Sequence, residues 1–239
     1  MAPQRRAGVE SVNAIARIFL ACIGLGLAGL SAAADPTTQP AGSQPAATRV
    51  SPELVKHIQH QLQDVTTVEA DFVELKNLAV LNHTLTIRGH MALEKPGKFI
   101  WIVREPVRYA IRLEDDEVRQ WDEDTDRVDV IRLGGDPTYK AISDQMRAWF
   151  LGNYGALAKD YEVDVLSENP LSLRFEPQAD SVVAKFMQRI VLTFAADQRY
   201  IEKMVVSETG GDTTTLEFVH TQLNQPVKDD IWRMPPNER

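Results

Sequence analysis

The residues of this chain that could do chemistry are few and scattered. His57 and His60 stand three positions apart in a stretch with helical spacing, which suits a metal, but no third ligand lies near them in the sequence. We therefore interpret them as part of a solvated helix face. His83, His90 and His220 occur singly on or beside strand-like runs, and we interpret them as surface or strand histidines.

An Asp-x-Asp-x-Asp spacing begins at Asp122, as at the start of a calcium-binding loop. An EF-hand also needs glycine at its sixth position and a bidentate glutamate at its twelfth. Arg127 and Leu133 occupy those two positions. The stretch is therefore predicted to be the polar tip of a hairpin, and the neighbouring pair Asp115-Asp116 to be a turn.

Known catalytic motifs are missing from the sequence. It has no Gly-x-Ser-x-Gly, no P-loop and no Gly-x-Gly-x-x-Gly. The single cysteine, Cys22, lies near the N-terminus in an apolar run, so the rest of the chain offers no disulfide, cysteine metal site or cysteine nucleophile. We predict that the protein is not an enzyme and uses no cofactor and no metal. Catalytic residues that converge from distant positions rank last among the alternatives.

Residues 1–34 have the pattern of a cleaved secretory signal peptide. Three arginines precede the apolar run of residues 18–30, and small residues ending in Ala32-x-Ala34 follow it. The run is shorter than the ~20 residues that a membrane-spanning helix needs. Residues 35–50 are rich in Pro, Thr, Ala and Gln, so we expect a flexible spacer after the cleavage site.

The chain is acidic. Its formal net charge is −8, and loss of the leader's three arginines and one glutamate makes it −10. Such a surface disfavours nucleic acid and anionic membranes as partners, because both are negatively charged.

From Ser51 onwards the sequence predicts one helix and then mostly strands. Ser51 is a good N-cap and is followed by Pro52, while Leu54, Ile58 and Leu62 form one apolar stripe. Turn signals then separate short β-rich runs, which favours an antiparallel meander, barrel or sandwich. The predicted strands are Glu69–Leu75, Thr84–Leu93, Lys98–Val103, Arg108–Leu113, Glu117–Trp121, Val128–Leu133, Tyr161–Leu166, Leu171–Phe175, Arg189–Phe194, Tyr200–Ser207 and Thr213–Thr221.

Helical spacing interrupts the strands within residues 134–160. Ile142, Met146, Trp149 and Phe150 fall on one face there, and a second short helix is expected over residues 156–159. Residues 179–188 are a further possible helix. A stripe of Met, Trp and Phe is more often plain core than a ligand-binding surface, so the pattern alone leaves both interpretations open.

The run KFIWIV, residues 98–103, is apolar on both faces. Phe99 and Trp101 point one way, and Ile100 and Ile102 the other. A central strand of any sandwich can show this pattern. The alternative is a strand with one face against the body of the protein and the other facing a cavity.

Several short motifs follow one another along the chain: Gly89-x-Met91, Lys95-Pro96-Gly97-Lys98-Phe99-x-Trp101, Glu105-Pro106, Gln120-Trp121-Asp122, WFLGNYGALAKDYEV, the region from RIVLTF to LNQPV, and IWRMPP. Their order is the one found in the periplasmic outer-membrane lipoprotein carriers, and the chain resembles this LolA-like family from about residue 51 to its end.

The resemblance implies the fold and the function. The fold would be mainly β with a helical lid (α+β): an unclosed, strongly curved antiparallel half-barrel of about eleven strands covered by short helices, over residues 51–239. The protein would be a soluble, monomeric periplasmic carrier that holds lipoprotein acyl chains in a hydrophobic cavity. Its partners would be an inner-membrane lipoprotein-release complex and an outer-membrane acceptor, with no nucleic acid.

The resemblance also suggests which residues carry the function. We predict that the lipid-binding side chains are Leu85, Ile87, Met91, Leu93, Phe99, Trp101, Tyr109, Ile111, Trp121, Leu216 and Phe218, and that the lid involves Lys95, Ile142, Met146, Trp149 and Phe150. Family members typically have an arginine where this chain has Lys95, and lysine keeps the charge but loses the planar set of donors.

Two other functions remain open on the same scaffold. One is a carrier or binder of free lipid. The other is an envelope-stress sensor of lipidated proteins, which would be expected to have a further partner-binding domain.

Overall fold

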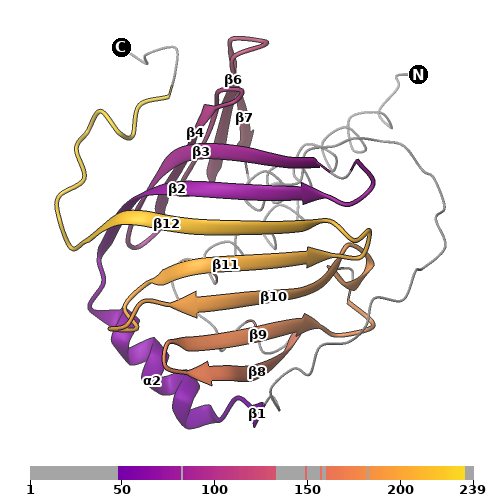
Figure 1. Cartoon of the computed structure of the whole chain (residues 1–239). Helices are drawn as coiled ribbons and strands as arrows, with labels where there is room; N and C mark the ends of the chain where they lie inside the picture. The colour runs from indigo at the N-terminus through magenta and orange to yellow at the C-terminus, as the bar shows by residue number, and fades with distance from the viewer. Residues whose placement is uncertain are drawn as a thin grey trace, which may run out of the picture.

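A single antiparallel sheet of twelve strands dominates the computed structural model, which describes residues 48–81, 83–132, 149, 157, 160–181 and 183–234. The order across the sheet is β1-β8-β9-β10-β11-β12-β2-β3-β4-β5-β6-β7, so β1 and β7 are its edges and the sheet does not close into a barrel. In Figure 1, β4 to β7 turn away from the plane of the other strands and recede behind them.

The strands are connected mainly as hairpins between neighbours. Their bounds are β1 Thr48–Arg49, β2 Thr67–Leu78, β3 His83–Glu94, β4 Lys98–Glu105, β5 Tyr109–Glu114, β6 Glu117–Asp122, β7 Arg127–Arg132, β8 Tyr161–Glu168, β9 Leu171–Pro177, β10 Met187–Phe194, β11 Ile201–Glu208 and β12 Thr213–Leu223. All eleven predicted strands are confirmed. The sequence missed β1, two residues that pair with β8 from within the predicted spacer and are too short to show any alternation.

Helix α2, Pro52–Gln63, begins where the sequence predicts. The Ser51 hydroxyl accepts a hydrogen bond from the backbone N–H of Leu54 at 3.1 Å, and proline occupies the first turn. Ile58 and Leu62 are its buried residues and join the main core of the sheet. The helix lies beside the ends of β8 and β9 (Figure 1).

The other expected helices are described only in part. Residues 179–188 contain a 3₁₀ turn, Val183–Lys185, because Met187 already begins β10. Of the helical segment expected within residues 134–160, the structure describes Trp149, Leu157 and Asp160. Within the described part of the chain, no helix has both the length and the apolar character needed to span a membrane.

The sheet has two apolar faces of unequal size. We call the inner face the one that carries the large core cluster, including Phe72, Trp101, Phe175 and Leu192. We call the outer face the opposite one, where a smaller cluster joins β3 to β6 to the segment that follows β12. Because successive side chains in a strand alternate, each strand of this region contributes to both faces.

Candidate functional site

Ten of the eleven predicted lipid-binding residues lie on the inner face. Strand register brings them together, since directly opposed residues in antiparallel strands share a face. Met91 is opposite Trp101, which is opposite Ile111, while Phe72 is opposite Phe218. The buried members are Met91, Leu93, Phe99, Trp101, Ile111, Leu216 and Phe218, and the half-buried ones are Leu85, Ile87 and Tyr109.

An aromatic stack forms the centre of this face. The rings of Phe72 and Trp101 are parallel with their centroids 3.8 Å apart, and Phe218 meets Trp101 edge-on at 6.4 Å. Gly89 lies on β3, between β2, which carries Phe72, and β4, which carries Trp101. Its lack of a side chain leaves room for the Phe72 ring. A Cβ at position 89 would stand 2.3 Å from the Phe72 ring and 2.2 Å from the carbonyl oxygen of Ile102.

A pocket opens at the α2 end of the inner face. It has a cavity volume of about 40 Å³, far below the ~150 Å³ of an engineered cavity that binds benzene. An acyl chain therefore enters only if the walls move apart. The lining comes from α2 and the segment after it, β2, β3 and the turn that follows it, the turn before β11, β11 itself and β12. The residues are Leu62, Val65, Val68, Ala70, Met91, Leu93, Lys95, Arg199, Tyr200, Ile201, Phe218 and Thr221.

Lys95 ties α2 to the turn between β3 and β4. Its ammonium nitrogen donates a hydrogen bond of 2.6 Å to the backbone carbonyl oxygen of Leu62, in the last turn of the helix. A cation is favourable there because the carbonyl end of a helix is partly negative. Burial lowers the pKa of Lys95, and the nearby carboxylate of Asp64 partly opposes that shift.

The segment between α2 and β2 is clamped from a second side. The side-chain oxygen of Asn224 accepts the backbone N–H of Thr66 at 2.7 Å, and its amide nitrogen donates to the carbonyl oxygen of Asp64 at 2.8 Å. The backbone N–H of Lys95 also donates to the carbonyl oxygen of Thr66 at 2.9 Å. These contacts and the Lys95 side chain fix α2 over the pocket.

Trp149 is the residue of the predicted apolar lid stripe that lies within the described part of the chain. It is buried against the β8–β9 half of the inner face, with its ring edge-on to Phe175 at 4.8 Å and to Tyr161 at 5.4 Å. The other three stripe residues, Ile142, Met146 and Phe150, lie outside the described residues.

Trp121 is set apart from the other ten predicted lipid-binding residues, because it packs on the outer face. There it joins Ile100, Trp232 and Met234 in the smaller cluster. This arrangement explains the two apolar faces of KFIWIV: Phe99 and Trp101 face the inner core, whereas Ile100 is covered by the C-terminal segment. The Ile100 side is therefore the one that packs against the body of the protein, and the Phe99 and Trp101 side is the one predicted to face a cavity, which stays a prediction.

Sequence reasoning missed a group of polar side chains on the inner face. Glu74 and Lys76 lie on β2, opposite Leu216 and Thr214 of β12, and all four are buried. Lys76 approaches a carboxylate oxygen of Glu208 at 3.6 Å. Burial raises the pKa of Glu74 to about 7, against a smaller opposing effect of Lys76. The sequence signal that could have revealed them is the alternation along β2, which places Glu74 and Lys76 on the same face as Ala70 and Phe72.

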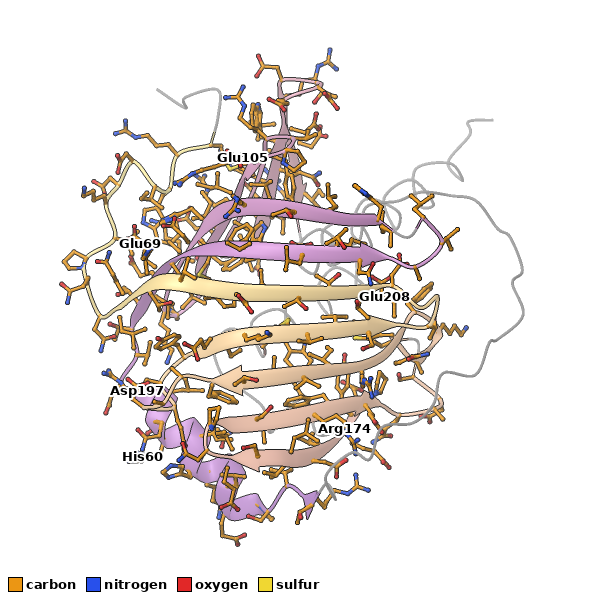
Figure 2. The ribbon with its side chains drawn as sticks, viewed as in Figure 1. His60, Glu69, Glu105, Arg174, Asp197 and Glu208 are labelled. Atoms are coloured by element: carbon orange, nitrogen blue, oxygen red, sulfur yellow. The ribbon has the colours of Figure 1, made fainter. Side chains whose placement is uncertain are left out.

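The predicted hairpin tip is confirmed at residues 123–126. A carboxylate oxygen of Asp122 accepts the backbone N–H of Thr125 at 2.9 Å, and Asp126 accepts the indole N–H of Trp121 at 3.1 Å. Within the described residues, no group of three or more His, Cys, Asp or Glu side chains is arranged to hold a metal ion. His60 lies exposed on α2 (Figure 2).

Comparison with known proteins agrees with this geometry. The family model for the outer membrane lipoprotein carrier protein LolA matches residues 63–235, which is more than half of the chain. The chain belongs to the LolA family. Its fold, a mostly β structure with an unclosed antiparallel sheet, agrees with the half-barrel that the resemblance predicted.

Individual LolA-family relatives are distant. An outer-membrane lipoprotein carrier protein from Chromohalobacter salexigens is 25% identical over 167 residues, covering 70% of this chain and 75% of the relative. One from Legionella pneumophila is 25% identical over 185 residues, covering 75% and 84%. A solved LolA superfamily protein from Nitrosomonas europaea superposes with a TM-score of 0.42 at 11% identity, covering 77% of this chain and 97% of that one.

Proposed function

We propose that this LolA-family protein is a periplasmic carrier that binds the acyl chains of lipoproteins on its inner face and moves them from the inner to the outer membrane. The observation that carries the proposal is the inner face itself. It is an extended apolar surface on a sheet that does not close, with a pocket at one end under a helix held by a few polar contacts.

The physical need for such a surface comes from the cargo. An acyl chain gains about 0.8 kcal/mol for each CH₂ group removed from water, so a lipidated protein does not cross an aqueous compartment unaided. A carrier must therefore have apolar side chains that pack against one another when the protein is empty and against the acyl chains when cargo is bound. The stacked and edge-on aromatic rings around Trp101 are surfaces of this kind.

Loading requires the pocket to widen, and we propose that the wall formed by α2 is the part that moves. Moving α2 outward breaks the Lys95–Leu62 hydrogen bond and withdraws Leu62 and Val65 from the pocket wall. That hydrogen bond contributes about 1.5–3 kcal/mol, and returning Leu62 and Val65 to water costs a similar amount for each side chain. At about 0.8 kcal/mol per buried CH₂, one long acyl chain offsets the total. Cargo therefore shifts the population toward an open form that the empty protein visits rarely.

The finer parts of the proposal rest on the family and on the proteins similar to this chain. They are the periplasmic location after cleavage of residues 1–34, the inner-membrane release complex and the outer-membrane acceptor. The curated relatives are named as outer-membrane lipoprotein carriers. In this role the protein holds an apolar load away from water and catalyses no reaction.

Binding of a synthetic diacylated lipopeptide to the purified protein, followed by native mass spectrometry, tests the central claim. Ile201→Glu places a charge at the pocket, and Val128→Glu places one at a half-buried valine of the outer-face cluster. We expect the wild-type protein and Val128→Glu to bind the lipopeptide and Ile201→Glu to lose at least tenfold in affinity. Equal binding by both variants would remove the inner face from the proposal.

The transport role is tested in cells. Depletion of the protein should leave outer-membrane lipoproteins in the inner membrane, as seen by membrane fractionation. Correct localisation after depletion, together with free lipid rather than lipoprotein in the protein purified from the periplasm, would favour the free-lipid carrier instead.

A further inference from the structure

Four polar side chains occupy the half of the inner face that lies away from α2. Glu74 and Lys76 come from β2, Glu208 from the end of β11 (Figure 2) and Thr214 from β12. All four are buried, with at most 8% of any residue exposed. Val68 and Ala70 of β2 line the pocket under α2, so this polar group lies further along the same strand, toward the β2–β3 and β11–β12 connections.

Glu74 stands out within this group because, among the described residues, it has no hydrogen bond and no ion pair. Lys76 lies 3.6 Å from a carboxylate oxygen of Glu208, whereas Lys76 acts on Glu74 only through its charge, and Glu74 is 1% exposed. Its direct cross-strand neighbours are Leu216 and Ile87, both on the apolar core. Burying a polar group without a partner is unfavourable, and a leucine at this position would fit the surroundings better.

The inner face carries other unpartnered polar atoms. Within the part of the chain that the structure describes, the hydroxyl of Thr214 and the indole N–H of Trp101 are buried without a hydrogen bond, as are the oxygens of Glu74. Buried polar groups in folded proteins nearly always have partners, and the exceptions call for an explanation. All three residues lie on the face proposed to receive cargo. A bound ligand that supplies their hydrogen-bond partners would therefore explain all three.

Resting on the proposed function, we propose that Glu74 is the polar anchor of the cargo site and hydrogen-bonds the linkage through which acyl chains are attached. The ligand class is an acylated molecule whose linkage carries an N–H or O–H donor, as an amide-linked acyl group does. The acyl chains would then run from Glu74 along the aromatic stack toward the pocket under α2.

Two ligands with the same chain but different linkages test the anchor. Dodecanamide offers N–H donors, and methyl dodecanoate offers none. In displacement of the fluorescent probe ANS from the full protein at about pH 8, where Glu74 is ionised and can only accept, we expect the wild type to prefer the amide by about tenfold, which is the effect of one hydrogen bond of about 1.4 kcal/mol. Glu74→Leu should bring this preference close to one while keeping the affinity for the ester.

Ile87→Ala is the matched control, because it removes apolar contact from the directly opposed residue. It should weaken both ligands equally and leave their ratio unchanged. An unchanged ratio in Glu74→Leu would overturn the anchor. If neither ligand displaces ANS from the wild-type protein, the proposed carrier function fails first, which is a different outcome.

Thermal unfolding distinguishes an anchor from a structural residue. A group kept for a ligand destabilises the empty protein, so Glu74→Leu should raise the melting temperature by about 2–4 °C. If the leucine variant folds poorly, the melting temperature of Glu74→Gln provides a second test. A fall in melting temperature for both variants would show that Glu74 serves the fold, and the anchor would be wrong.

Discussion

The two apolar faces of strand β4 are covered by different parts of the chain. On its outer side, Ile100 packs under Trp232 and Met234 of the C-terminal segment. On its inner side, Trp101 stacks on Phe72 and Phe99 packs beside Trp101, along the proposed cargo path. Both faces are buried in this structure, so burial alone does not tell a cargo surface from a core.

The two faces differ in the hydrogen bonding of their tryptophan indoles and in the unpaired Glu74. On the outer face the indole N–H of Trp121 donates to Asp126, and the guanidinium of Arg112 donates to the carbonyl oxygen of Trp232 at 2.7 Å. On the inner face, the indole N–H of Trp101 and both oxygens of Glu74 have no hydrogen bond among the described residues. His90 Nε2 on the outer face also lacks a hydrogen bond, but it lies 3.2 Å from a carboxylate oxygen of Glu69. The described residues give Glu74 no such ion pair, so a ligand can supply its partner.

The largest expected effect is at Trp101. Trp101→Ala removes a fully buried ring from the centre of the stack and should lower the free energy of unfolding by about 4 kcal/mol. Urea denaturation measures the loss, and lipopeptide binding should fall with it. A loss below about 1 kcal/mol with unchanged binding would contradict the role of the inner face.

Glu74 gives the next largest effect, and it depends on pH. The unfolded chain releases the Glu74 proton near its ordinary pKa of 4.5, but the folded protein holds it until about pH 7. Between these values the folded state binds more protons, so its stability falls as pH rises, by about 3 kcal/mol in total.

Glu74→Gln removes this dependence. The variant's free energy of unfolding minus that of the wild type should be level below about pH 4, rise from there to about pH 7, and then stay level. Lys76 and Glu208, the charged neighbours, are present in both proteins and largely cancel in the difference. A difference that does not vary with pH would show that Glu74 is not desolvated.

Trp232 provides the test of the outer face. Trp232→Ala exposes Ile100 and removes the ring on which the Lys98 ammonium lies at 4.4 Å from the centroid. We expect a loss of about 2 kcal/mol in denaturation experiments, near the burial energy of one large side chain. Lipopeptide affinity should stay within twofold of wild type. A tenfold loss would mean that the outer face also contributes to cargo binding.

The strands and the apolar inner face were predictable because alternation and turn signals are local. Trp121 was placed with the lipid-binding residues because the sequence cannot show that the segment after β12 returns to cover β4 to β6. Glu74 escaped prediction for a related reason. A Glu-x-Lys pair usually marks a solvated face, and only its register with Leu216 and Ile87 reveals burial.

Lys95 illustrates a prediction that depended on the family. The resemblance made position 95 part of the lid, and its side chain does contact a helix over the pocket, namely α2. The spacing of Lys95-Pro96-Gly97 predicts a turn but not what that turn touches. The partner, Leu62, is 33 residues earlier in the chain, and only the folded sheet brings the two together.

The smallest expected effect is at this contact. Lys95→Met removes one charged hydrogen bond at the carbonyl end of α2 and should lower stability by about 1.5 kcal/mol. If α2 opens for loading, the same change should raise the association rate of the lipopeptide several-fold in stopped-flow measurements. Lys95→Arg keeps a donor and should stay near the wild-type rate. Equal rates in all three proteins would mean that cargo enters without moving α2, and the proposed gate would have to lie elsewhere in the chain.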